Sequence, residues 1–240
     1  MSCVHTIDTT SADCFRSFAK LRNAQVVDAE GAQGVITDVQ GLTFFSGIAC
    51  MNGDGGDTAE RVARVIEPFQ TRRAPFRWWV SPASPPDLQP VLITKGLRFT
   101  WNSAGMVADI ERMRFGPMPQ GLRVERMTSG DAMRTWAQLI VTVFQKPLSD
   151  ADIWLDAFGQ LGYGEDSQWA HFVGFLDNQP VATTSVMLAG ERVGVYHVGT
   201  LAEARGKGVG SAVTLAAIEH ARERGAKIAA LQSSEMAESV

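Results

Sequence analysis

The sequence predicts two mixed α/β units in tandem, each a largely antiparallel sheet flanked by helices. Three observations support this fold class. The chain has 240 residues, enough for one large domain or two small ones. Near the middle, glycine and proline crowd into residues 116–121, where they would interrupt helix and strand alike. The predicted strands and helices follow a similar order on both sides of this cluster. We therefore expect domains at 1–115 and 122–240, joined by a linker at 116–121.

The composition is typical of a soluble globular protein and argues against several classes. The hydrophobic fraction is 45%, the charged fraction 20% and the mean hydropathy −0.03. A net charge of −4 argues against nucleic acid as a partner. We expect a cytoplasmic protein with no membrane partner, because neither a basic leader nor an apolar stretch of membrane length is seen. The odd set Cys3, Cys14 and Cys50, without a CxxC pair, argues against a disulfide framework and a zinc ribbon, and no other spacing indicates a metal site.

The second half has the clearer pattern of secondary structure. A helix capped by Ser129 or Asp131 and a hairpin turning at Asp177 and Asn178 are its strongest local signals. Gly225 is placed to end the last helix. The predicted elements are strand 123–127, a helix to about 144, helix 151–161, strands 169–176, 181–188 and 192–201, helix 208–224 and strand 227–232.

The first half repeats this order in a less regular form. Its aromatic segments FRWWV and RFTW and its apolar segment AGMVADI all suggest strands. The predicted elements are helix 11–21, strands near 35–39 and 42–50, helix 58–69, strand FRWWV, helix 87–95, and strands RFTW and AGMVADI.

The motif that carries chemistry follows the strand at 192–201. Three alternate glycines, Gly206, Gly208 and Gly210, stand between a strand and a helix, where backbone N–H groups can converge on a phosphate. Arg205 and Lys207 add positive charge. The spacing fails the Walker pattern, and the dinucleotide fingerprint fits poorly because its sixth position is Ser211. The structural alternative is a tight turn whose glycines only supply positive φ.

This segment resembles the acyl-CoA-binding core of the GNAT N-acetyltransferase superfamily. Arg205, Gly208 and Gly210 fill that family's pattern, and the resemblance covers about 122–240, most sharply 195–231. It implies that backbone amides hold the pyrophosphate of acetyl-CoA. The residues implied are Arg205, Gly206, Lys207, Gly208, Val209, Gly210 and Ser211. It further implies that Val198, Gly199 and Thr200 pair with the pantetheine arm, on a strand splayed from its neighbour, and that the Val198 amide polarises the thioester carbonyl.

The chain departs from the family pattern in two places. The first half resembles a degenerate copy of the same fold, in which MNGDGGD replaces the glycine loop. Asp54 and Asp57 would repel a pyrophosphate, so we expect this half to bind no CoA. It would wall the acceptor pocket or mediate dimerisation. At the other end, the family tyrosine that serves as general acid would fall just past Val240, in register with 234–237. The strand at 227–232 would then lack its usual partners, so we expect a first-half segment or a second copy to cover it.

Several side chains are candidates for proton transfer and acceptor binding. His197 faces the expected thioester and could act as the base, although a structural histidine is the alternative. Because successive side chains of a strand point to opposite faces, Tyr196 is expected to point away from the thioester, and only one of this pair can face the reaction. Three aromatic residues have two possible roles, lining the acceptor site as in the family or packing in the core. They are Trp154, Phe158 and Tyr163. Less favoured candidates are Glu203, Glu165 and His171.

The sequence therefore predicts an N-acyltransferase that moves acetyl from acetyl-CoA to a primary amine, on a small molecule or a peptide. Direct attack in a ternary complex is expected, because no activated Cys or Ser is visible for a covalent intermediate. A non-catalytic acyl-CoA-binding or regulatory module is the alternative, and a dinucleotide-binding protein is a third. No metal is expected, and a homodimer is compatible with the sequence.

Overall fold

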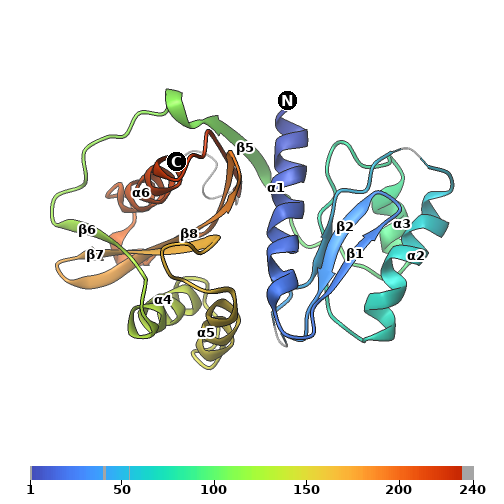
Figure 1. Ribbon diagram of the computed structural model, residues 1–240, viewed down its shortest axis with the longest axis horizontal. Coiled ribbons are helices and arrows are strands. Elements are labelled where there is room, and N and C mark those ends of the chain that lie inside the picture. Colours follow the sequence, from blue (N-terminus) through green and yellow to red (C-terminus); the bar gives the residue numbers. More distant parts are fainter. Residues whose placement is uncertain (1, 40–41, 54, 234–240) are drawn as a thin grey trace. The chain divides into compact units, whose positions relative to one another are not determined.

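The computed structural model describes residues 2–39, 42–53 and 55–233. The chain divides into two compact units, mainly Met1–Gly105 and Met106–Gln232 (Figure 1). Residues 106–115, which the sequence analysis assigned to the first half, lie in the second unit. Residues 113–119 have no regular secondary structure. Asp54 and the segment 234–237, both used in the sequence analysis, lie outside the described residues.

The second unit is built on a six-stranded sheet with the order β5-β10-β9-β8-β7-β6. From β6 to β9 neighbouring strands are antiparallel, whereas β9 and β10 are parallel. The strands are β5 (Ala104–Asp109), β6 (Leu122–Arg126), β7 (Trp169–Leu176), β8 (Gln179–Ala189), β9 (Arg192–Thr200) and β10 (Ile228–Ser233). This is the mixed, largely antiparallel sheet that the sequence predicts.

Helices cover both faces of this sheet. Figure 1 shows α6 (Val209–Glu223) on one face, and α4 (Gly130–Val143) and α5 (Asp150–Leu161) on the other. Ser129 caps α4 by accepting a hydrogen bond from the Ala132 N–H at 3.3 Å. Gly225, with a φ of +91°, follows the end of α6 as predicted. The core between α6 and the sheet is aliphatic and includes Val186, Val193, Val195, Val213 and Ala217.

The β7–β8 hairpin has the position predicted from its turn residues. Asp177 and Asn178 have φ values of +51° and +65°, the two left-handed positions that a tight two-residue hairpin requires. Asn and Asp tolerate this conformation better than most residues. The turn, together with a register shift between Gly174 and Phe175, sets the register in which His171 on β7 faces Ser185 on β8.

Strand β5 covers the outer edge of β10. It pairs with β10 in the sheet, and just beyond it the Ile110 N–H donates to the Lys227 carbonyl at 2.9 Å. The Ile110 side chain is fully buried in the core of the second unit. The expectation that a segment preceding the linker covers this edge is confirmed.

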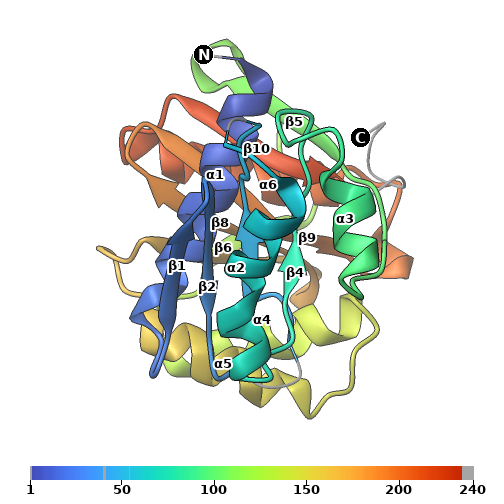
Figure 2. The same cartoon turned by 90° about the vertical axis from the view of Figure 1, so that its right-hand side faces the viewer.

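The first unit repeats the plan on a smaller scale, with a four-stranded sheet in the order β1-β2-β3-β4. β1, β2 and β3 are antiparallel neighbours, and β3 and β4 are parallel. Its elements are α1 (Cys3–Ser17), β1 (Gln25–Ala29), β2 (Ala32–Ile36), β3 (Gly47–Ala49), α2 (Thr58–Thr71), β4 (Arg77–Trp78) and α3 (Leu88–Thr94). Figure 2 views this unit from the side of α2 and α3.

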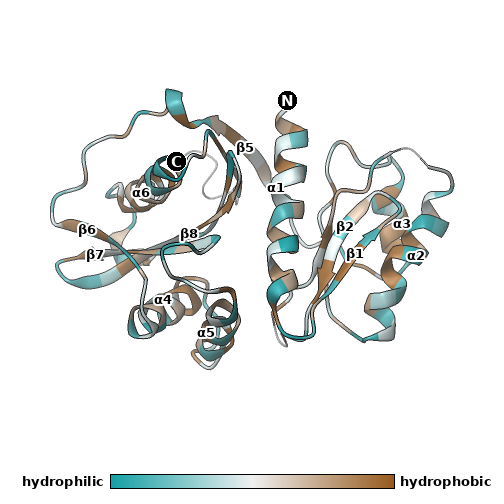
Figure 3. Cartoon of the chain, in the orientation of Figure 1, coloured by the Kyte–Doolittle hydropathy of each residue, from teal (hydrophilic) through white to brown (hydrophobic). Residues whose placement is uncertain are grey.

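The core of the first unit lies between its sheet and the helices α2 and α3. Val62, Val65, Ile66 and Phe69 form the buried side of α2, whereas Glu67 on the same helix is exposed. The hydropathy colouring in Figure 3 shows this division on α2, which carries both hydrophilic and hydrophobic residues. Such a one-sided apolar stripe is what packs a helix on a sheet.

One strand predicted for the first unit is absent, and another is shorter than predicted. RFTW is not a strand, because residues 98–101 have no regular structure and the side chains of Phe99 and Trp101 are exposed. The aromatic strand FRWWV is only two residues long, Arg77–Trp78. In addition, the sequence analysis missed β1. Aromatic residues favour strands only where a neighbouring strand is available for pairing, and local composition does not reveal that neighbour.

Candidate active site

The glycine loop leaves the N-terminus of α6 open to solvent. Gly206 and Gly208 adopt φ values of +72° and +73°, a conformation that glycine reaches without steric cost. Gly208 immediately precedes α6, and no side chain caps this helix end. Residues 205–208 are exposed. The first amides of α6 therefore present the positive end of a helix to an anion, and no side chain among the described residues caps them.

Thr200, the last residue of β9, ties this loop to the sheet. The Arg205 Nε–H donates to the Thr200 carbonyl at 3.0 Å. On the following helix, a Cβ atom at Gly210 would lie only 3.0 Å from Thr200 Oγ1. Glycine at position 210 thus allows the start of α6 to lie directly against the end of β9. The spacing of the three glycines is explained by two needs, positive φ at 206 and 208 and close approach at 210.

Strand β9 separates from β10 before it reaches this loop. The parallel register ends at the pair Val195 and Leu231, whereas β9 continues to Thr200. On its other side β9 remains paired with β8 up to Ala182 and Thr200. Among the described residues, the parallel register with β10 thus ends before Val198, Gly199 and Thr200. Val198, in this segment, has 40% of its side-chain surface exposed.

A β-bulge lies at the point where the strands separate. The β8–β9 register shifts between Thr183 and Ser185, and His197 has a φ of +56°. A non-glycine residue in this region is uncommon and costs energy, so the surrounding structure must hold it. The bulge interrupts the alternation that was expected to place Tyr196 and His197 on opposite faces. The ring of Trp169 lies 5.3 Å from Tyr196 and 6.1 Å from His197, measured between centroids.

Comparison with known proteins agrees with this geometry. The model of the acetyltransferase (GNAT) family matches residues 133–237, which include β9, the glycine loop and α6. The second unit contains a GNAT acetyltransferase domain. No curated protein sequence matches the chain significantly.

Solved structures extend the likeness to both units. A GCN5-related N-acetyltransferase from Kribbella flavida is similar over 94% of this chain and 85% of its own, with a TM-score of 0.69 and 20% identity. A tandem GNAT protein from the clavulanic acid biosynthesis pathway is similar over 78% of this chain and 65% of its own, with a TM-score of 0.52 and 15% identity. At these identities the likeness concerns the fold, and the tandem GNAT fold predicted from the sequence is confirmed.

Aromatic rings from α4, α5 and β7 surround His197 of the GNAT domain. The His197 ring centroid lies 5.0 Å from that of Trp154, 5.8 Å from Trp136 and 5.9 Å from Phe158. All three of these aromatic side chains are buried, so Trp154 and Phe158 belong to the core. Such packing fixes the side chain at the bulge and limits the positions that its imidazole can take.

His171, a less favoured candidate in the sequence, lies in the interior of the second unit. It is fully buried on β7, and its Nδ1 lies 2.9 Å from Ser185 Oγ on β8. Burial holds the His171 pKa well below its usual value, and the charge of His197 lowers this pKa further. His171 is therefore neutral at physiological pH. Only the cross-strand register brings these residues together, so no local sequence signal could have identified the pair.

The first unit fills its equivalent of the phosphate site with its own side chains. Asp57 caps α2 by accepting from the Glu60 N–H at 2.9 Å, so a carboxylate occupies the end of the helix where a phosphate would bind. Arg61, nearly fully buried, donates through Nη2 to the carbonyls of Glu30 and Asn52 at 2.6 and 2.8 Å. This arrangement supports the expectation that the first unit binds no CoA.

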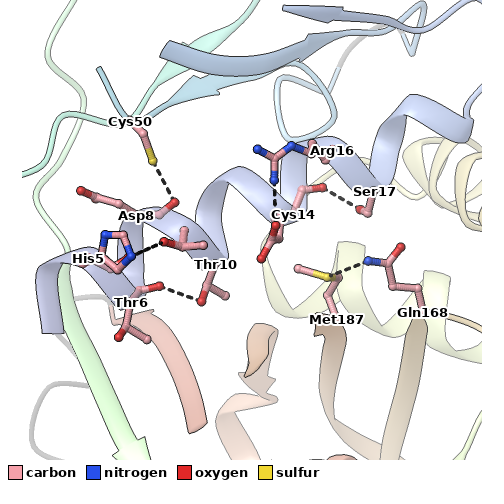
Figure 4. Close-up of polar contacts among 12 residues, drawn as sticks. His5, Thr6, Asp8, Thr10, Cys14, Arg16, Ser17, Cys50, Gln168 and Met187 are labelled. Atoms are coloured by element: carbon pink, nitrogen blue, oxygen red, sulfur yellow. Dashed lines mark hydrogen bonds and ion pairs between the residues drawn. The ribbon is translucent and has the colours of Figure 1, made fainter. Parts of the chain in front are cut away.

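A second polar cluster ties α1 to the strands of the first unit. The Cys50 Sγ–H donates to the Asp8 carbonyl at 2.9 Å (Figure 4), and Ser81 Oγ–H donates to Asp8 Oδ2 at 2.9 Å. Burial, together with the nearby charge of Asp8, raises the pKa of the Cys50 thiol to about 12. The thiol is therefore protonated and a poor nucleophile at neutral pH.

The described residues contain neither a metal cluster nor a membrane span. No group of three or more His, Cys, Asp or Glu side chains in them could hold a metal ion. Nor is any helix among them long and apolar enough to span a bilayer.

Proposed function

We propose that the chain is an N-acyltransferase that transfers acetyl from acetyl-CoA to a primary amine by direct attack in a ternary complex. The observation that carries this proposal is the uncapped, glycine-lined start of α6 beside a strand edge released from β10. Both features suit an extended donor that carries a pyrophosphate at one end and a thioester at the other.

In this proposal the glycine loop binds the pyrophosphate and β9 binds the pantetheine arm. Backbone amides from Arg205 to Ser211 would take the phosphate oxygens, with Lys207 contributing charge. Val198, Gly199 and Thr200 would pair with the amide groups of the arm through the free edge of β9. The Val198 N–H would donate to the thioester carbonyl oxygen and stabilise the oxyanion that develops there.

The acceptor would attack the thioester carbon as a neutral amine. The new C–N bond forms, the C–S bond breaks, and CoA leaves as a thiolate. The amine nitrogen must lose a proton, and His197 at the bulge is the residue that we assign as its acceptor. The aromatic side chains packed around His197 would hold the imidazole in place for this transfer.

The experiment must separate catalysis from binding alone. Calorimetry with acetyl-CoA tests the donor site, and thiol release in the presence of a panel of primary amines tests transfer. We expect both signals. Acetyl-CoA binding without thiol release for any amine would favour a non-catalytic acyl-CoA-binding module. NAD binding in place of acetyl-CoA would contradict the proposal altogether.

A further inference from the structure

Arg77 on β4 is a partly buried guanidinium that has no carboxylate partner among the described residues. Its Nη2 donates to Thr43 Oγ1 at 3.0 Å, which is a bond to a neutral hydroxyl. Its Nε is shielded from solvent and has no hydrogen-bond partner among the described residues. Burial lowers the Arg77 pKa, which shows that the surroundings disfavour its charge. A shielded cation without a counter-ion is costly unless an anion binds to it.

Trp101 lies beside this guanidinium, and Trp79 packs against Trp101. The Arg77 Cζ is 5.5 Å from the ring centroid of Trp101, within the range of a cation–π contact. The Trp79 ring meets the Trp101 ring edge to face, with centroids 6.0 Å apart. Trp101 leaves 49% of its surface exposed, and its Nε1–H donates to Ser103 Oγ at 3.1 Å. The indole is thus held in one orientation while much of its surface remains open.

We propose that Arg77, Trp79 and Trp101 form a binding site in the first unit for a small organic anion that carries an aromatic ring. The guanidinium would take the carboxylate or phosphate of this ligand through its planar fork of donors. The ring of the ligand would pack on the exposed face of Trp101. Every residue of this site belongs to the first unit, so its ligand is bound without the glycine loop of the second unit.

This site gives the first unit a role of its own. Asp57 caps the N-terminus of α2, yet Arg77 on β4 retains a charge that no carboxylate among the described residues neutralises. The residues after α3 expose Phe99 as well as Trp101, although no strand forms there. A ligand-binding surface explains why aromatic side chains are exposed in a segment that has no pairing partner.

Tryptophan fluorescence and calorimetry on the full chain, without CoA, test the site. The probes are indole-3-acetate, phenyl phosphate, 3-methylindole and acetate. We expect the two ring-bearing anions to bind at least about tenfold more tightly than the neutral ring or the bare anion. The relative affinity of the carboxylate and the phosphate identifies which anion the site prefers. Equal affinity for indole-3-acetate and 3-methylindole, or no binding of any ring-bearing anion at about 5 mM, would overturn the proposal.

Variants connect the binding to the named residues. Arg77→Met and Trp101→Ala should each weaken indole-3-acetate binding about tenfold. Arg98→Met is the matched control, because Arg98 is an exposed arginine of the neighbouring segment, and it should bind within twofold of the wild type. Acetyl-CoA affinity should be unchanged in all three variants, which separates this proposal from that of acyl transfer.

A conservative variant guards against misfolding. If Arg77→Met fails to fold by circular dichroism, Arg77→Lys retains the charge but loses the planar fork. Arg77→Lys should still weaken indole-3-acetate binding several-fold. Wild-type affinity in Arg77→Lys would show that the guanidinium does not recognise the ligand, and the proposal would fail.

Discussion

Cys50 and His197 occupy equivalent positions in the two units. Each lies two residues beyond the last parallel pair of its strand, Ile48 with Trp78 in the first unit and Val195 with Leu231 in the second. Each has a positive φ, +57° and +56°. The backbone irregularity is thus common to both units, whereas the side chain that it carries differs. In the first unit this side chain is a protonated thiol bonded to α1, and in the second it is an imidazole packed among aromatic rings.

This equivalence gives a test of His197 as the base. His197→Gly removes the imidazole and relieves the strain of about 1 kcal/mol that a side chain at positive φ carries, whereas His197→Ala removes the imidazole and retains that strain. We expect His197→Gly to lower kcat about a hundredfold or more with little change in acetyl-CoA affinity. Cys50→Gly is the matched control in the first unit and should transfer acetyl within twofold of the wild type. Wild-type kcat in His197→Gly would place the base elsewhere.

Bulky residues in the glycine loop should abolish acetyl-CoA binding. Gly208→Val places side-chain atoms beside the first amides of α6, and Gly210→Val forces its Cβ against Thr200 Oγ1 and so displaces the start of α6. Lys207→Ala removes only one charge and should weaken binding modestly. Backbone strain needs its own control, because Gly208 has a φ of +73°. Gly190 has a φ of +62° and open space around it, so Gly190→Ala measures the effect of backbone strain alone. Gly208→Ala introduces the same kind of strain within the loop. Calorimetry should show lost affinity only in the loop variant.

Ile110 should matter to the second unit although it precedes the linker. Its side chain is fully buried there, so Ile110→Ala should lower the free energy of unfolding by about 2–4 kcal/mol. Ile93→Ala removes the same atoms from an exposed position and should change stability by about 0.5 kcal/mol or less. Urea unfolding compares the two. Similar midpoints for both variants would mean that the segment before the linker does not stabilise the β10 edge.

The buried His171 should make the second unit less stable in acid. Its folded pKa is depressed, so the unfolded state binds more protons below the unfolded pKa of about 6.5. Stability should fall by roughly 1.4 kcal/mol per pH unit once the pH drops below this value, down to the folded pKa. Hydrogen exchange of the Phe172 and Val173 amides between pH 7.5 and 5 measures the change. His171→Gln should remove most of this dependence of stability on pH. His220→Gln is the control, because the pKa of His220 is also lowered.

One acetyl-CoA should bind per chain. Asp57 occupies the helix N-terminus of the first unit, and Arg61 packs beside Gly55 in the same loop. Calorimetry should therefore give a stoichiometry of one, and a crystal soaked with CoA should show density only at the glycine loop of the second unit. CoA density in both units would contradict the assignment of the first unit as non-binding.

The sequence by itself determined the features that depend on neighbouring residues. Asp177 and Asn178 fixed the hairpin, Gly225 ended α6, and the spacing from Arg205 to Gly210 located the loop, because turn geometry and helix ends are set within a few residues. The tertiary structure alone decided the pairing of β5 with β10, the contact between His171 and Ser185, and the position of Trp101 beside Arg77. These contacts join residues 14 or more positions apart, and their formation depends on which strands pair and in which register. Local periodicity does not contain that information, because the same alternation of side chains fits an edge, a central strand or an unpaired segment.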